Sequence, residues 1–115
     1  MTNEPSVRVV VTPHFNRSFK RLRKKYRRLG DDLKPLIEQL ESGETPGDQI
    51  QGVKLTVYKV RLSSSDAQRG KSGGYRVIYY VRTAVSIFLV EIYPKSERTD
   101  ISADEIRRLI DDLET

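Results

Sequence analysis

The chain has 115 residues, of which 32% are charged and 37% hydrophobic, and its formal net charge is +5. This length fits one domain with a single core, and the absence of any long apolar run or signal peptide excludes a membrane span and predicts a cytoplasmic protein without membrane partners. The absence of cysteine excludes disulfides, thiolate catalysis and cysteine-based zinc sites, and the single histidine, His14, excludes catalysis by a histidine pair.

The N-terminal elements are a tail, a strand and the start of a helix. We expect residues 1–6 to be a disordered tail and residues 7–115 to form one domain. Residues 7–11, VRVVV, are rich in β-branched side chains and predict a strand. Thr12 then offers an N-cap, and Pro13 occupies the first helical position, where its missing N–H costs nothing. A helix is therefore predicted to begin at Pro13.

An apolar stripe predicts that this helix continues to Leu29 and ends at Gly30. Its members recur every three or four residues: Phe15, Phe19, Leu22, Tyr26 and Leu29. A second helix is predicted from Asp32 to about Leu40, since Pro35 falls in its first turn, where a proline is tolerated. Together the two helices are predicted to form a hairpin.

The second half of the chain predicts strands and a final helix. A turn-rich connection, SGETPGDQIQG, precedes three strand candidates at residues 57–62, 75–82 and 86–93. Ser102 and Glu105 form a capping-box pattern for the last helix, and Ile101 is placed to pack against Ile106. The predicted order is β-α-α-β-β-β-α, which indicates an α+β domain with its helices on one face of a small, largely antiparallel sheet.

The cations are grouped along the chain. Residues 13–30 hold eight Lys or Arg and no acid, and residues 52–83 hold seven cations and one acid. Grouped cations on a small domain indicate a polyanionic ligand, usually nucleic acid, although a basic helix can also be no more than a solvated face. The residues of the first helix that we predict to bind RNA are Arg23, Lys24, Arg27 and Arg28.

The strands predict a cationic face. Because side chains alternate along a strand, Lys59 and Arg61 lie on one face, and Arg76 joins them if its strand pairs with theirs as a hairpin. The end of the last strand brings further groups to the same edge: Tyr93, Lys95 and Arg98. Cations so close together repel one another, so they predict a bound phosphate. The alternative is that each pairs with a nearby acid: Asp66, Glu97 or Asp100.

The residue types that are missing narrow the chemistry. One histidine cannot supply both the acid and the base for RNA cleavage. The acids fall mainly in the predicted helices, away from the cationic strands, so no cluster resembles a two-metal nuclease site. We therefore expect neither a metal nor another cofactor, and any catalysis would rely on Lys, Arg or Tyr.

Several segments together resemble one protein family. The layout, the closing amphipathic helix and the segments GDQIQG, YKVRL, RGKSGGYRVIYYV and IYPKSERTDIS are similar to the RelE family of bacterial type II toxins, especially its HigB-like branch. The resemblance covers residues 7–113. It implies a ribosome-dependent endoribonuclease that cuts mRNA in the ribosomal A site without a metal. It also implies a cognate antitoxin, encoded beside the toxin, that holds it inactive.

The same resemblance implies roles for individual residues. Lys59 and Arg61 match the paired basic positions of the family, and Arg76 matches the arginine of its Gly-Tyr-Arg motif, which would hold the scissile phosphate. The preceding loop would grip neighbouring phosphates or ribosomal RNA through two cations, Arg69 and Lys71. Where the archetype has an arginine, this chain has Ser96, and a late tyrosine of the archetype has no match. The general acid is therefore left open among Lys95, Arg98 and Tyr93.

Two alternative functions share the predicted fold. ParE-type toxins resemble RelE but poison DNA gyrase and have no nuclease site, and fold alone does not distinguish them. A non-catalytic or decayed toxin would bind RNA through the basic first helix only. The joint presence of Lys59, Arg61 and Arg76 on the strands favours the nuclease.

Overall fold

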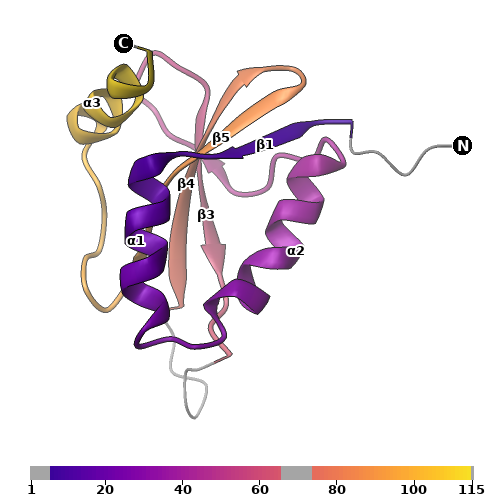
Figure 1. The fold of residues 1–115 in the computed structure, drawn as a ribbon. Helices are drawn as coiled ribbons and strands as arrows, with labels where there is room; N and C mark the ends of the chain where they lie inside the picture. Colours follow the sequence, from indigo (N-terminus) through magenta and orange to yellow (C-terminus); the bar gives the residue numbers. More distant parts are fainter. Residues whose placement is uncertain (1–5, 66–73, 115) are drawn as a thin grey trace, which may run out of the picture.

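The computed structural model describes residues 6–65 and 74–114 (Figure 1). The elements are β1 (Arg8–Val11), α1 (Pro13–Arg23), α2 (Leu29–Glu41), β2 (Asp48–Gln49), β3 (Val57–Leu62), β4 (Tyr75–Thr83), β5 (Ser86–Pro94) and α3 (Ala103–Glu114). The α+β class and the order of the predicted elements are confirmed. One short strand, β2, is additional and lies inside the turn-rich connection.

Some predicted features lie outside the described residues. These are Asp66, Arg69 and Lys71, together with most of the predicted tail. The last residue of that tail, Ser6, is described, and its hydroxyl donates a 3.2 Å hydrogen bond to the carbonyl oxygen of Glu41. None of the three described helices has the length and apolar character that crossing a membrane requires.

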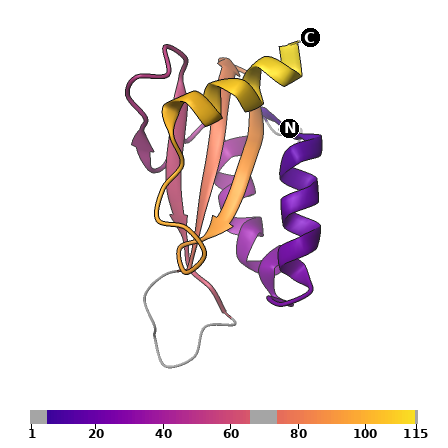
Figure 2. The ribbon, with the colours of Figure 1, turned by 90° about the vertical axis from the view of Figure 1, so that its left-hand side faces the viewer.

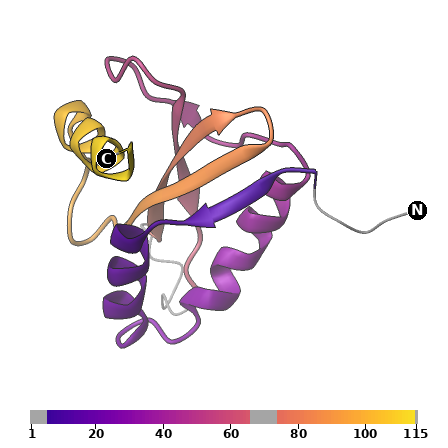
Figure 3. The same ribbon diagram turned by 45° about the horizontal axis from the view of Figure 1, so that its top comes forward.

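Five strands form one sheet in the order β1-β5-β4-β3-β2. β1 runs parallel to β5, and Figure 3 shows these two strands side by side. The other pairs are antiparallel, as predicted for most of the sheet. The central strand β4 is buried at every residue from Tyr75 to Tyr80. A strand buried on both faces requires cover on both sides of the sheet.

The helices cover both faces of the sheet, so the prediction of helices on one face is wrong. α1 and α2 form the predicted hairpin on one side, and α3 lies across the other (Figure 2). The reason is the alternation along β4. Val77 and Tyr79 belong to the core cluster under the hairpin. Ile78 belongs to a second cluster that contains Ile106 and Ile110 of α3.

The boundary between the first two helices also differs from the prediction. The chain turns at Tyr26, whose ring packs edge-on against Tyr75 with centroids 5.3 Å apart. Leu29 then becomes fully buried as the first residue of α2. Gly30 therefore lies inside α2 instead of ending α1. The packing does not require a glycine here, since a Cβ would lie 3.8 Å from the ring of Phe19, an ordinary van der Waals contact.

Both predicted N-caps are confirmed. Thr12 Oγ1 accepts a 3.2 Å hydrogen bond from the N–H of Phe15, and Ser102 Oγ accepts one of 3.1 Å from the N–H of Glu105. These side chains satisfy amide groups that have no partner within the first helical turn. The Glu105 carboxylate pairs with Arg98 instead of closing the predicted capping box.

Gly74 fixes how β4 begins. Its φ of +57° lies in the left-handed region, and a Cβ there would collide with the carbonyl oxygen of Leu62. Glycine alone allows this close approach. The next residue, Tyr75, is the cross-strand partner of Leu62, so the contact starts the β3–β4 register. That register determines which side chains of the two strands face each other.

Candidate active site

Three strands bring the predicted site residues into one row. Arg76 of β4 lies between Arg61 of β3 and Tyr93 of β5, and each is its direct cross-strand partner. Directly opposed residues share a face of a sheet. Tyr93 belongs to the core cluster under α3, so the row lies on the α3 face. Lys59 is two residues before Arg61 on β3 and shares that face.

Arg76, at the centre of this row, is the one buried arginine in the described part of the chain, with 9% of its surface exposed. Its Nη1 donates a 3.3 Å hydrogen bond to the carbonyl oxygen of Tyr75. Burial of a guanidinium is costly unless acceptors or anions surround it. A second cation, Arg61, lies directly opposite and is exposed to solvent. This pair of cations favours an anionic ligand between them.

Tyr93 completes the row, and its hydroxyl is in an unusual environment. The residue is 2% exposed, and its Oη has no hydrogen-bond partner among the described residues. The guanidinium of Arg98 lies over its ring, 5.3 Å from the centroid. Burial, helped by the charge of Asp100, raises the pKa of Tyr93 above its ordinary value, so the hydroxyl keeps its proton at neutral pH. A buried hydroxyl without a partner is a polar group whose hydrogen-bonding capacity the described fold leaves unsatisfied.

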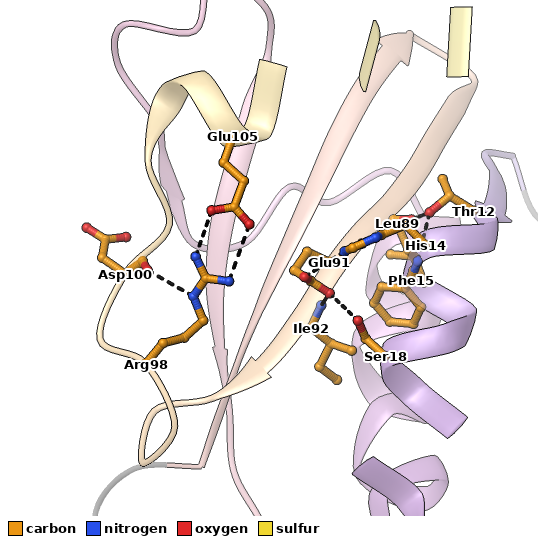
Figure 4. A network of polar contacts seen from close by, with 10 residues as sticks. All are labelled: Thr12, His14, Phe15, Ser18, Leu89, Glu91, Ile92, Arg98, Asp100 and Glu105. Carbon is orange, nitrogen blue, oxygen red and sulfur yellow. Dashed lines mark hydrogen bonds and ion pairs between the residues drawn. The ribbon is translucent and has the colours of Figure 1, made fainter. Parts of the chain in front are cut away.

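Two of the predicted cations are paired with acids. Lys59 Nζ lies 3.2 Å from Asp100 Oδ1. Arg98 Nη2 lies 2.9 Å from Glu105 Oε1, and Arg98 Nε donates a 3.1 Å hydrogen bond to the carbonyl oxygen of Asp100 (Figure 4). Lys59 and Arg98 therefore pair with acids, as the alternative prediction stated. The partner of Lys59, Asp100, was predicted, whereas the partner of Arg98, Glu105, was not.

These contacts shift two pKa values. The hydrogen bond from the N–H of Ile101, helped by Lys59, holds the pKa of Asp100 below its ordinary value. The hydrogen bond to Glu105 raises the pKa of Arg98. Both shifts favour the charged forms, ionised Asp100 and protonated Arg98. An anion that binds to Lys59 or Arg98 has to compete with a carboxylate already in place.

The other predicted cations that the structure describes lie apart from the row. Lys95 is exposed after the end of β5, and its N–H donates a 3.1 Å hydrogen bond to Gly74. Four exposed cations lie at the end of α1 and in the turn that follows it: Arg23, Lys24, Arg27 and Arg28. They belong to the hairpin layer, opposite α3. Glu97, predicted as a partner for a site cation, instead pairs with Arg21 of α1 at 3.4 Å.

Sequence reasoning missed a buried acid beside the site. Glu91 of β5 is 6% exposed and binds two side chains of α1 (Figure 4). His14 Nε2 lies 2.7 Å from one carboxylate oxygen, and Ser18 Oγ donates a 2.6 Å hydrogen bond to the other. The signal in the sequence was a lone acid within the apolar run IFLVEIY. Within residues 6–65 and 74–114, no group of three or more His, Asp or Glu side chains is placed to hold a metal ion.

Comparison with known proteins gives the family. A family model described as "RelE toxin of RelE / RelB toxin-antitoxin system" matches residues 13–111, which include the whole row and its flanking ion pairs. The chain belongs to the RelE toxin family. The family membership predicted from the sequence is therefore confirmed.

The individual relatives share less than a third of the aligned residues with this chain. The chain is 28% identical over 92 residues to the mRNA interferase toxin RelE of Escherichia coli K12 and to the mRNA interferase RelE of Shigella flexneri. Each alignment covers 76% of this chain and 87% of the relative. A solved structure of E. coli toxin RelE in the free state, in which two arginines are replaced by alanine, is 23% identical to this chain and has a TM-score of 0.49. The match covers 82% of this chain and 88% of that one.

Proposed function

We propose that the protein is the toxin of a type II toxin–antitoxin system and cuts mRNA in the ribosomal A site, in the cytoplasm, without a metal or other cofactor. Membership of the RelE family supports the toxin assignment, and the curated relatives are named mRNA interferases. The observation that carries the proposal is the row of Arg61, Arg76 and Tyr93, in which two arginines and a tyrosine whose buried hydroxyl has no partner among the described residues occupy adjacent positions on three neighbouring strands. We assign the chain to the HigB-like branch on its sequence motifs.

The proposed chemistry is cleavage through the 2′-hydroxyl of the RNA. The 2′-oxygen forms a bond to phosphorus while the bond from phosphorus to the 5′-oxygen breaks, and negative charge gathers on the phosphate oxygens. Arg76 holds the scissile phosphate, and Arg61 and Lys59 add positive charge where it is needed in the transition state. The proton of the 2′-hydroxyl passes to water. The ribosome supplies the in-line geometry that a shallow site cannot impose on free RNA.

The leaving 5′-oxygen needs a proton from a general acid. The three candidates are Tyr93, Lys95 and Arg98, and their surroundings differ. The guanidinium of Arg98 is held by Glu105 and by a backbone carbonyl. Lys95 lies in solvent beyond the strand. Tyr93 is favoured, because no hydrogen bond or ion pair holds its hydroxyl among the described residues and the residue lies directly opposite the arginine that would hold the phosphate.

The partners follow from the same proposal. The toxin acts on ribosome-bound mRNA and is held inactive by a cognate antitoxin, as the RelE/RelB pairing of its family implies. The antitoxin would place acidic residues near the row or near the basic end of α1. We propose that Arg69 and Lys71, which precede β4 in sequence, contact phosphates of mRNA or ribosomal RNA.

The proposal is tested by adding purified protein to a bacterial cell-free translation reaction and mapping the ends of the mRNA. We expect cuts only when ribosomes translate the message, with or without a chelator. Arg76→Gln should abolish cleavage while ribosome binding persists, because one phosphate contact among many is lost. Intact mRNA in a translating extract would disprove the proposal, and inhibition of gyrase in its place would assign the protein to the ParE-like alternative.

A further inference from the structure

Glu91, the buried acid of β5, lies two residues before Tyr93 of the row (Figure 4). Its Oε1 accepts a 2.6 Å hydrogen bond from Ser18 Oγ and one of 2.9 Å from the N–H of Ile92. Its Oε2 lies 2.7 Å from His14 Nε2. A carboxylate is costly to bury unless hydrogen bonds occupy its oxygens, and both oxygens are occupied here. The proposed function assigns no role to this group.

The carboxylate takes the place of a neighbouring strand at the edge of β5. β1 pairs with β5 only as far as Leu89, whose carbonyl oxygen accepts a 3.3 Å hydrogen bond from the N–H of Thr12. α1 begins at the next residue, so no strand of the described sheet lies on that side of β5 beyond Leu89. Further along β5, the N–H of Ile92 has the Glu91 side chain as its acceptor. A side chain thus satisfies a backbone group of a strand that has lost its neighbour.

Glu91 also follows an irregularity in the pairing of β5 with β4. The register skips one residue of β5, Val90, directly before Glu91. An extra residue of this kind is a β-bulge, which bends the strand and re-aims the side chains beside it. Beyond the bulge, the register places Tyr93 opposite Arg76. A shift of one residue would turn Tyr93 to the other face of the sheet, so the position of the bulge determines the row.

α1 holds the carboxylate from the helix side. His14 and Ser18 are four residues apart, so they lie on the same face of α1. The start of α1 is itself tied to β5, since Thr12 Oγ1 donates a 2.8 Å hydrogen bond to the carbonyl oxygen of Leu89. In a hydrolytic triad the histidine lies between the serine and the acid, whereas here the carboxylate lies between the other two. This arrangement anchors a strand and does not activate a nucleophile.

We infer that Glu91 is a positioning residue of the active site, which fixes the bulge at Val90 and thereby the place of Tyr93 opposite Arg76. Without the carboxylate, the N–H of Ile92 loses its acceptor, and the end of β5 loses its link to α1. A reacting group displaced by about 1 Å can lower a rate about 10²-fold. The effect on cleavage rests on the proposed function, but the effect on the strand register does not.

The register is tested in the free protein by NMR. Nuclear Overhauser effects between Arg76 and Tyr93 report the pairing beyond the bulge, and those between Val81 and Ile87 report the pairing before it. We expect Glu91→Ala to weaken the first set and to keep the second. Glu91→Gln should keep both sets, because its amide oxygen can still accept the backbone N–H. Wild-type effects in both sets for Glu91→Ala would overturn the inference.

Cleavage by the same variants separates positioning from binding. Glu91→Ala should lower the maximal rate about 10²-fold, while the concentration of mRNA-programmed ribosomes that gives half the maximal rate stays the same. Glu91→Gln should restore most of the rate. Leu33→Ala is the control, since it removes a buried side chain from the hairpin core and leaves the partners of Glu91 in place. Denaturant unfolding is measured for all variants. An equal loss of rate in folded Leu33→Ala would attribute the effect to stability and overturn the inference.

A shorter acid covers the case in which Glu91→Ala does not fold. Glu91→Asp keeps the charge but draws the carboxylate back by one methylene, so it cannot hold all three partners. It should weaken the contacts between Arg76 and Tyr93 and lower the maximal rate, and a wild-type register and rate would contradict the inference. A wild-type protein that does not cut would overturn the proposed function, and the NMR comparison would then decide the role of Glu91 by itself.

Discussion

The hydroxyl of Tyr93 is buried without a hydrogen-bond partner among the described residues, so its removal separates stability from activity. Tyr93→Phe deletes only this group. We expect the free energy of unfolding to stay the same or to rise by about 1 kcal/mol, because no intramolecular hydrogen bond is lost and an unsatisfied polar atom is removed. Cleavage should fall by about 10²–10⁴-fold if the hydroxyl is the general acid.

Tyr80→Phe is the matched control for this change. Tyr80 lies on the same face of the neighbouring strand, in the same core cluster, but pairs across the sheet with Val57 and Phe88 instead of an arginine. Denaturant unfolding and end-mapping of mRNA are measured for both variants. A drop in the stability of Tyr93→Phe of about 1 kcal/mol, the usual worth of a hydrogen bond, would reveal a structural partner. Wild-type cleavage by that variant would assign the acid to another residue.

Single residues also mark where sequence reasoning works. The caps at Thr12 and Ser102 were predictable because their hydrogen bonds are local, reaching three residues ahead. The bond between His14 and Glu91 joins residues that are far apart in the chain, so no local pattern indicates it. Glu105 was predicted to serve its own helix, yet it binds Arg98. The partner of Glu105 depends on how α3 packs against the rest of the domain, and the hydrophobic periodicity of the helix does not indicate that packing.

At the scale of elements, the basic end of α1 is the feature to test. We expect the joint replacement of Arg23, Lys24, Arg27 and Arg28 by Gln to weaken binding to ribosomes. The slope of log affinity against log salt should fall by up to about 3, since each lost phosphate contact removes about 0.7–0.9 from it. Sedimentation with ribosomes at several salt concentrations measures both quantities.

The control replaces four exposed cations elsewhere in the described chain: Lys34, Lys54, Arg82 and Arg108. It changes the net charge by the same amount but leaves the end of α1 intact. A similar loss of affinity in both variants would mean that net charge alone drives binding. Full affinity in the α1 variant would show that this basic end is only a solvated face.

The elements themselves were largely predictable, and their packing was not. Alternation and β-branching identified the segment Val57–Leu62 as a strand with the bounds that the structure gives. The position of α3 required a different fact, namely that β4 is apolar on both faces. Periodicity does reveal such a strand, as an unbroken apolar run, but it does not say which helix covers which side. The turn at Tyr26 was missed because its cause is a contact with Tyr75, distant in sequence.

At the scale of the whole molecule, the cations are divided between two layers. The arginine row lies on the α3 face, and the basic end of α1 belongs to the hairpin layer. An antitoxin that silences the toxin needs apolar contacts to bind tightly over such a surface, whereas RNA binds mainly by releasing counterions. We therefore expect the affinity for the antitoxin to change little between low and physiological salt, while the affinity for RNA falls steeply.

This prediction is checked by measuring both dissociation constants over the same salt series with the same protein preparation. The RNA complex serves as the internal reference for a purely ionic interaction. An antitoxin complex that dissociates as steeply as the RNA complex would show that charge, and not apolar burial, provides its affinity.

The parallel pairing of β1 with β5 determines when the toxin can complete its fold during its own synthesis. Arg8, near the N-terminus, pairs with Ser86, and the partners of Arg76 come from β3 and β5. A chain grows from its N-terminus, so β1 waits unpaired until β5 has been made. Such long-range pairing also closes late, because the loop must be formed before its contacts stabilise it. A ribosome translating this chain therefore carries an inactive nascent chain until β5 has been made, which gives an antitoxin time to meet the toxin as it folds.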